Sequence, residues 1–377
     1  MRRPEFWLKS CLHWKLKMLY AADMALPFLK STSKKKRDQM LSIDLGGRNT
    51  KAVFLQRKGN GLALSNYVLL DAPIYERDPS VDLLTEHFQA VAQALDVKTK
   101  LVALALCVNE SIVRHVEMPQ MPPDDIRLVL KNNARMYLQQ DLPDYVFDVS
   151  VMSRPREAAG GKQAASQKNK ILVAGAKREL MSNLQAAAKN VGWVMDHIIP
   201  GLIAPVSAFE MAMPQEFAGE VVGLVNLGFK NSTICLLRGG ELIMSRVVAI
   251  GGDKLTSGLA EAMNISYAEA EGIKIGMPTE VESNLEPLII PLGRELRASV
   301  DFFEHQEERT VGQVYVCGGA SRSEFILQIL KQELMMDCRT WNPATSLQLD
   351  LPSQKAAELE QVASQLTVAV GTALTAL

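Results

Sequence analysis

Three glycine-containing turns, each directly after an apolar run, limit what this chain can fold into. They are DLGGRNT at residues 44–50, NLGFKNST at 226–233 and CGGASRS at 317–323. Glycine permits a positive φ and a close approach to the backbone, and successive exposed N–H groups in such a turn can bind an anion. We expect the first two turns to hold phosphates from opposite sides, and the third, which opens a helix, to approach a nucleoside or its first phosphate. The first two also share one plan, strand, Asp or Asn, glycine turn, strand, which indicates an internal duplication.

The composition is that of an ordinary globular protein. The chain has 377 residues, enough for two domains, with 47% hydrophobic residues and a formal net charge of −1. Its five cysteines form no CxxC pair and its five histidines show no metal-site spacing, so we expect a reducing compartment and no zinc site. No apolar run reaches the roughly 18 residues that a membrane-spanning helix needs.

The N-terminal segment 1–40 is basic. Up to residue 38 it holds ten Lys or Arg, four of them in KKKR at 34–37, and only three acidic residues. One interpretation is a solvated, disordered leader. The other is a weak attraction to an anionic membrane surface, where each cation contributes roughly 1 kcal/mol.

Periodicity predicts alternating strands and helices along the rest of the chain. Residues 41–68 read as two strands, and 153–170 as a long, mobile polar hairpin loop. The spacings Ser266 to Glu269 and Ser321 to Glu324 are typical of capping boxes at the start of helices. The other expected strands are 101–108, 145–152, 171–176, three within 221–252, and 314–317. The other expected helices are 81–95, 121–140, 178–192, two after 252, 295–306, one after the third glycine turn and 356–376.

With these residues in this order, the sequence resembles the actin-like ATPase superfamily, and within it most closely the PilM family of type IV pilus assembly proteins, which is related to FtsA. The most PilM-like pieces are MPPDDI at 121–126 and the R-x-V-x-x-GG-D-x-LT segment at 246–256. The resemblance covers nearly everything from Ser42 onward. It implies an α/β, actin-like (ribonuclease H-like) duplicated fold with an inserted α+β subdomain. The implied parts are a first subdomain at 41–100 to which a C-terminal helix returns, an inserted subdomain at 101–198 and a second half at 199–377.

The resemblance also implies a nucleotide, ATP or ADP, in the cleft between the halves. The matching residues come from both phosphate turns, a connecting turn, an E-x-x-K pair and the adenosine turn: Asp44, Gly46, Gly47, Asn49, Thr50, Lys51, Asn226, Gly228, Asn231, Ser232, Gly251, Gly252, Glu271, Lys274, Gly318, Gly319 and Ser321. For the E-x-x-K pair, a solvated helix face is the structural alternative.

One position departs from the family pattern. Asn226 stands where the family normally has an aspartate that supports Mg²⁺, and Phe229 replaces a small residue beside it. An amide brings no charge, so we expect Asp44 to hold Mg²⁺ only weakly, through water. The prediction is nucleotide binding with little or no hydrolysis, or an empty cleft, and no catalytic residue is identified.

The resemblance implies a cytoplasmic scaffold, peripheral to the inner membrane through its partners. Those partners are the cytoplasmic N-terminal tail of a PilN-like single-pass membrane protein and pilus assembly ATPases, with no nucleic acid. The machine is a type IV pilus or a type II secretion-like system. It also suggests that the chain starts at Met24, with residues 1–23 an upstream extension.

Two other functions stay open. A sugar kinase of the same superfamily would need an aspartate base, usually in an Asn-Asp pair, and the sequence holds no such pair. An FtsA-like cell-division protein would normally end in an amphipathic membrane-targeting tail, and GTALTAL at 371–377 does not have that character.

Overall fold

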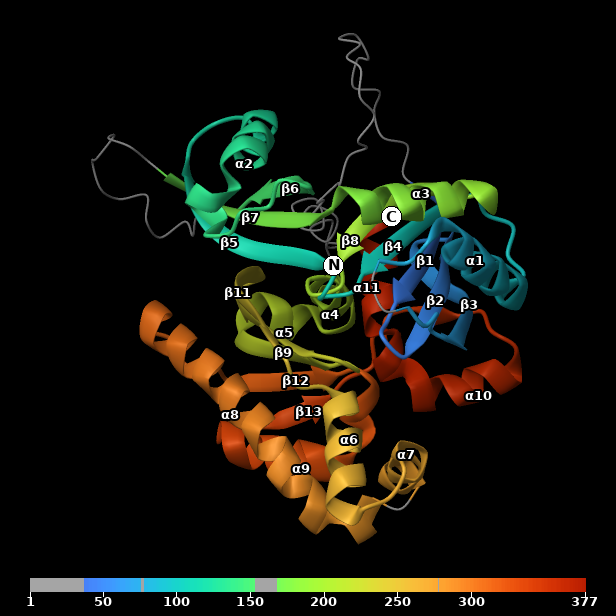
Figure 1. Ribbon diagram of the computed structural model, residues 1–377, viewed down its shortest axis with the longest axis vertical. Coiled ribbons are helices and arrows are strands. Elements are labelled where there is room, and N and C mark those ends of the chain that lie inside the picture. The colour runs from blue at the N-terminus through green and yellow to red at the C-terminus, as the bar shows by residue number, and fades with distance from the viewer. Residues whose placement is uncertain (1–36, 76–77, 153–167, 277) are drawn as a thin grey trace, which may run out of the picture.

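The computed structural model describes residues 37–75, 78–152, 168–276 and 278–377. Most of the basic leader, the suggested start at Met24 and most of the predicted hairpin loop at 153–170 lie outside the described residues. The described chain forms two similar halves, with an additional small subdomain on the first half (Figure 1).

The first half is built on a six-stranded sheet in the order β14-β3-β2-β1-β4-β8. Residues 41–68, predicted as two strands, contribute to three, because Gly59 with a φ of +58° allows a tight second turn. Helices α1 and α3 cover one face of this sheet through apolar residues at helical spacing. The elements are β1 (Gln39–Leu45), β2 (Asn49–Lys58), β3 (Gly61–Asp71), α1 (Val81–Leu95), β4 (Leu101–Leu106), α3 (Arg178–Asn190), β8 (Val194–Pro200) and β14 (Gln348–Leu349).

The second half repeats this plan in a five-stranded sheet ordered β11-β10-β9-β12-β13. In both halves a three-stranded antiparallel meander is extended by two parallel strands. This repetition confirms the duplicated fold. The elements are α5 (Pro214–Gly219), β9 (Val221–Leu227), β10 (Ser232–Arg238), β11 (Glu241–Val248), α6 (Gly252–Met263), α7 (Tyr267–Gly276), α8 (Glu282–Glu307), β12 (Gln313–Cys317), α9 (Glu324–Leu334) and β13 (Cys338–Thr340). Helix α10 (Ser353–Val362) returns to the first half, where the Tyr67 hydroxyl donates to the carbonyl of Lys355.

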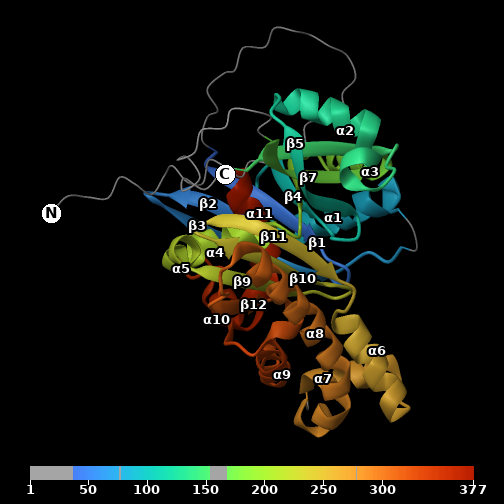
Figure 2. The same ribbon diagram turned by 90° about the vertical axis from the view of Figure 1, so that its left-hand side faces the viewer.

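The inserted subdomain is a three-stranded sheet, β5-β7-β6, packed against one helix. Its elements are β5 (Ser111–Pro119), α2 (Pro123–Leu138), β6 (Tyr145–Val151) and β7 (Lys168–Lys177). In both views it lies at the opposite end of the molecule from α6 and α7 (Figure 2). Strands β4 and β8, which the expected bounds 101–198 would include, pair within the first sheet. We therefore propose narrower bounds for this subdomain, 111–177.

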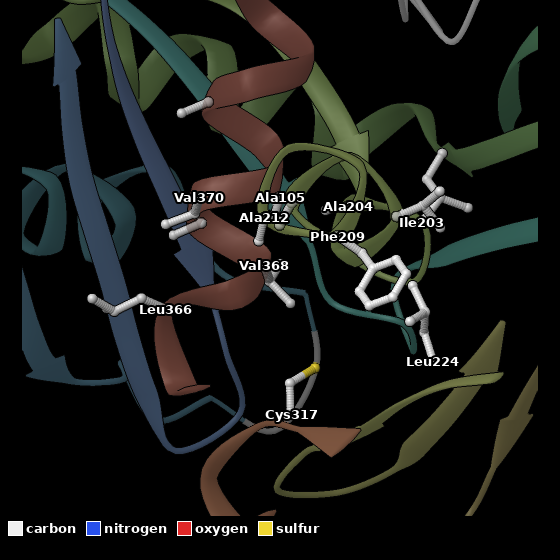
Figure 3. Close-up of a cluster of buried hydrophobic side chains, with 14 of the residues drawn as sticks. Ala105, Ile203, Ala204, Phe209, Ala212, Leu224, Cys317, Leu366, Val368 and Val370 are labelled. Atoms are coloured by element: carbon white, nitrogen blue, oxygen red, sulfur yellow. The ribbon is translucent and has the colours of Figure 1, made fainter. Parts of the chain in front are cut away.

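Two helices join the halves through the largest core. These are α4 (Ala204–Ala212) and α11 (Thr367–Ala376), which cross where Gly371 meets the backbone of Ala204. A Cβ added at Gly371 would lie 1.8 Å from the carbonyl oxygen of Ala204, so only glycine allows this approach. Figure 3 shows Val370 of α11 beside the strands of the first half, with Phe209 of α4 pointing toward Leu224 of the second.

Three helix predictions differ from the structure. Helix α8 runs from Glu282 rather than 295, across Pro287 and Pro291, because a continuous buried face holds it on the second half. The N-cap of α9 is Ser323, whose hydroxyl accepts from the N–H of Ile326, and not Ser321. The expected helix 356–376 is divided into α10 and α11 by a 3₁₀ turn at Ala363–Leu366. By contrast, the capping box at Ser266 is present, with reciprocal hydrogen bonds to Glu269.

Within the described ranges, no helix combines the length and apolar character needed to cross a membrane.

Candidate nucleotide site

A cavity of about 520 Å³ lies where the three glycine turns of the two halves meet. It is lined by the β1–β2 turn, the β9–β10 turn, the turn after β12 and one side of α7. Thirteen of the seventeen residues predicted from the sequence line it: Asp44, Gly46, Gly47, Asn49, Lys51, Asn226, Gly228, Asn231, Gly252, Glu271, Lys274, Gly318 and Gly319.

The other four predicted residues lie behind the turns. The hydroxyl of Thr50 is 2.7 Å from Nε2 of His87, and that of Ser232 donates to the carbonyl of Ile250 at 2.7 Å. The remaining two are Ser321, whose hydroxyl donates to the Gly318 carbonyl at 2.8 Å, and Gly251, packed against the backbone of Phe229. These four residues do not line the cavity and shape the turns from behind, so their contact with a nucleotide stays a prediction.

The two phosphate turns have the same geometry. A Cβ on Gly46 would lie 2.6 Å from the carbonyl oxygen of Asn49, and a Cβ on Gly228 would lie 2.6 Å from that of Asn231. Real Cβ contacts are essentially never shorter than 3.0 Å, so both positions require glycine. The matching contacts follow from matching registers, with Asp44 opposite Lys51 in one hairpin and Asn226 opposite Thr233 in the other. The internal duplication inferred from the sequence therefore extends to individual backbone contacts.

The third turn abuts the second one. Gly318 has a φ of +95°, and a Cβ there would lie 2.5 Å from Oδ1 of Asn226 and 2.5 Å from the carbonyl oxygen of Leu227. The left-handed conformation and the close approach both exclude a larger residue. As a result the Asn226 amide lies directly beside the third turn.

The E-x-x-K pair on α7 belongs to a network rather than to a solvated face. Lys274 Nζ lies 2.6 Å from a carboxylate oxygen of Glu271 and also contacts the hydroxyl of Thr256, while Arg48 of the first phosphate turn contacts the other Glu271 oxygen. Burial alone would raise the pKa of Glu271. Hydrogen bonds from Lys274 and Thr256 and the charges of Lys274 and Arg48 outweigh that effect and lower it. Glu271 is thus a carboxylate that ties the two halves together across the cavity.

Sequence reasoning missed the residues that connect the halves. Besides the Arg48 contact, the side-chain amide of Asn231 donates to Oδ1 of Asn109 at 2.8 Å. It also missed Lys230, which lines the cavity next to Phe229, the residue already noted as an unusual replacement in the second turn. The sequence did carry a signal for these cations, because Arg48 and Lys230 occupy the same position in the two duplicated turns.

The family resemblance implies a Mg²⁺ ion beside the phosphate turns. Mg²⁺ in nucleotide sites is usually held by one or two carboxylates and keeps several waters. Asp44 is the carboxylate closest to this role, but its Oδ2 lies 3.1 Å from the ammonium of Lys51. The corresponding residue of the second turn is the uncharged Asn226, and the described residues contain no group of three His, Cys, Asp or Glu side chains suited to a metal ion. These residues do not fit a Mg²⁺ site.

Comparison with known proteins decides the family. The model of the family described as Type IV pilus assembly protein PilM matches residues 42–377. The chain belongs to this family. The fold of this chain is similar to that of a chain in a solved PilM-PilN type IV pilus biogenesis complex, with a TM-score of 0.77 at 20% sequence identity. The match covers 89% of this chain and 98% of the chain in the complex. The architecture described above is accordingly the actin-like fold with an inserted α+β subdomain.

Two curated relatives are cell division proteins FtsA. That of Bacillus subtilis (strain 168) is 20% identical over 254 residues, which cover 62% of this chain and 57% of the relative. That of Streptococcus pneumoniae serotype 2 (strain D39 / NCTC 7466) is 25% identical over 158 residues, 42% of this chain and 32% of the relative. The chain thus spans about half, or less, of the length of these relatives.

Proposed function

We propose that this PilM-family chain acts in type IV pilus assembly as a scaffold that binds the cytoplasmic tail of a PilN-like membrane protein. The observation that carries the proposal is the match of the family model over 42–377, supported by the similarity to a chain of a PilM-PilN complex. In this role the protein lies at the cytoplasmic face of the inner membrane through its partners, which include pilus assembly ATPases.

The proposal includes a nucleotide, ATP or ADP, in the cavity between the halves. Three glycine turns, a type of turn that can bind an anion through backbone N–H groups, line it together with cationic side chains from both halves. Hydrolysis is expected to be slow or absent, because one phosphate turn carries an amide and the carboxylate of the other is paired with Lys51. The nucleotide then stabilises the contact between the halves rather than driving a reaction.

An FtsA-like role in cell division is the second candidate, because the two curated relatives named above are FtsA proteins. The two roles differ in their partners, so partner identity separates them.

The test is capture of partners in the native host. The protein is cross-linked in its membranes, purified under mild conditions and analysed by mass spectrometry. The proposal predicts a single-pass membrane protein with a short cytoplasmic N-terminus, together with pilus or secretion ATPases. Division proteins as the main partners would favour the FtsA-like role, and recovery without any partner would contradict the scaffold.

A further inference from the structure

Phe229 fills the space between the two phosphate turns. It occupies the position that Gly47 has in the first turn, and its side chain reaches that glycine. A Cβ placed on Gly47 would lie 3.4 Å from Cδ1 of Phe229 and 3.5 Å from Cγ of Lys230. These are van der Waals distances, so the aromatic ring occupies the space beside the first turn.

Two cations flank the ring. The guanidinium of Arg48 lies 5.9 Å from the ring centroid and the ammonium of Lys230 lies 5.4 Å from it. Cations over an aromatic face are attracted by its negative quadrupole. Each is also held by an acid of the second half, Arg48 by Glu271 and Lys230 by Asp253 at 2.8 Å. The ring, its two cations and their acids are therefore gathered at one end of the cavity.

Charge at the cavity wall is supplied by protein cations. Lys51, Lys274 and Arg322 line the cavity in addition to Arg48 and Lys230, against the three acids Asp44, Asp71 and Glu271. Among the described residues, Arg322 makes no ion pair or side-chain hydrogen bond. The wall thus offers positive charge to phosphates without a metal ion, whereas the residues at the expected Mg²⁺ position do not fit one.

We propose that the cleft binds a nucleoside diphosphate without a divalent cation, because Phe229, Arg48 and Lys230 fill the gap between the two phosphate turns that a terminal phosphate and its Mg²⁺ would need. The inference rests on the proposed nucleotide site and specifies its ligand. A triphosphate would have to displace the ring from Gly47 and separate the cations from their acids. A diphosphate contacts the third turn and the near side of the phosphate turns and leaves this group intact.

The test is isothermal titration calorimetry of the full chain with ADP and with the non-hydrolysable triphosphate analogue AMPPNP, each in Mg²⁺ and in EDTA. We expect the Kd of ADP to change by less than about threefold on removal of Mg²⁺, and Mg·AMPPNP to bind at least about tenfold more weakly than ADP. Tighter binding of Mg·AMPPNP than of ADP, or loss of ADP binding in EDTA, would overturn the inference but leave a nucleotide site in place. Absence of binding by both nucleotides would overturn the inference and the nucleotide part of the proposed function together.

A substitution at Phe229 tests whether its ring is what excludes a triphosphate. Phe229→Gly gives the second turn the residue that the first has at Gly47, and we expect it to bring the AMPPNP affinity to within about threefold of the ADP affinity. The control is Phe302→Ala, which removes an exposed ring on α8 and is expected to leave the ratio unchanged. An unchanged ratio in a folded Phe229→Gly protein would overturn the assignment of the ring. If this variant does not fold, the ratio measured on the unaltered chain still decides the proposal.

Discussion

Replacing Gly371 by alanine tests the crossing of the two helices that join the halves. The added Cβ would lie 1.8 Å from the carbonyl oxygen of Ala204 and 2.6 Å from its carbonyl carbon. To reach even 3.0 Å from that oxygen, the helices would have to separate by about 1.2 Å. The obstacle is backbone on a buried helix, so no side-chain rotation can relieve it.

The expected cost follows from two opposing effects. Overpacking a core typically costs about 1–3 kcal/mol and sometimes more, whereas alanine in place of glycine inside a helix gains up to about 1 kcal/mol. Because the whole α11–α4 contact must open, we expect the free energy of unfolding to fall by at least about 2 kcal/mol.

The assay is urea unfolding followed by far-ultraviolet circular dichroism, with the midpoint as the readout. The matched control is Gly272→Ala in α7, where an added Cβ meets nothing within 4 Å, so its midpoint should equal or exceed that of the unaltered chain. If Gly371→Ala unfolds at the same urea concentration as the unaltered chain, the helices do not cross as closely as described.

Three further changes have defined outcomes. Asn226→Asp places a second carboxylate among the phosphate turns and should increase Mg²⁺-dependent ATP affinity in calorimetry; an unchanged affinity would contradict the role given to the amide. Arg127→Met leaves the carboxylate of Asp148, 1% exposed, without the guanidinium that lies 2.6 Å and 2.8 Å from its Oδ1, and should cost about 3–5 kcal/mol in urea unfolding at neutral pH; a loss below 1 kcal/mol would show that the pair is not needed. Burial, aided by the charge of Lys170, lowers the pKa of His115 to about 4 from its ordinary 6.5, so the unfolded chain binds this proton first. His115 therefore leaves the free energy of unfolding unchanged above pH 6.5 and lowers it, by at most about 3 kcal/mol, as the pH falls toward 4. A His115→Gln variant whose stability had the same acid dependence would refute this.

The sequence predicted the features that depend on local chemistry. The glycine turns at Gly46 and Gly228, the amphipathic helix α1 and the capping box at Ser266 are specified by neighbouring residues, and all are present. The duplication was visible because the same residue types recur at the same spacing in two hairpins.

The rest depends on contacts between distant segments. The strand β5 was not predicted, because its alternation is interrupted by charged residues; it is stabilised by pairing with β7 and by burial of Val113 and Met118. The start of α8 was missed because its prolines are tolerated only on a helix held by a long buried face. The bond between Arg48 and Glu271 depends on how the halves pack, which no local pattern encodes.

The return of α11 to the first sheet has a consequence for synthesis on the ribosome. Val370 and Ala373 pack in one core with Met40 and Val53 of the first sheet, although the two segments lie about three hundred residues apart. At roughly 5–20 residues per second, the ribosome needs on the order of 15–60 s to pass from β2 to α11. During that interval one face of the first sheet lacks the helix that covers it in the finished protein. The first half is therefore expected to complete its folding only after α11 has left the ribosome, and nascent chains stalled before α11 should remain sensitive to protease.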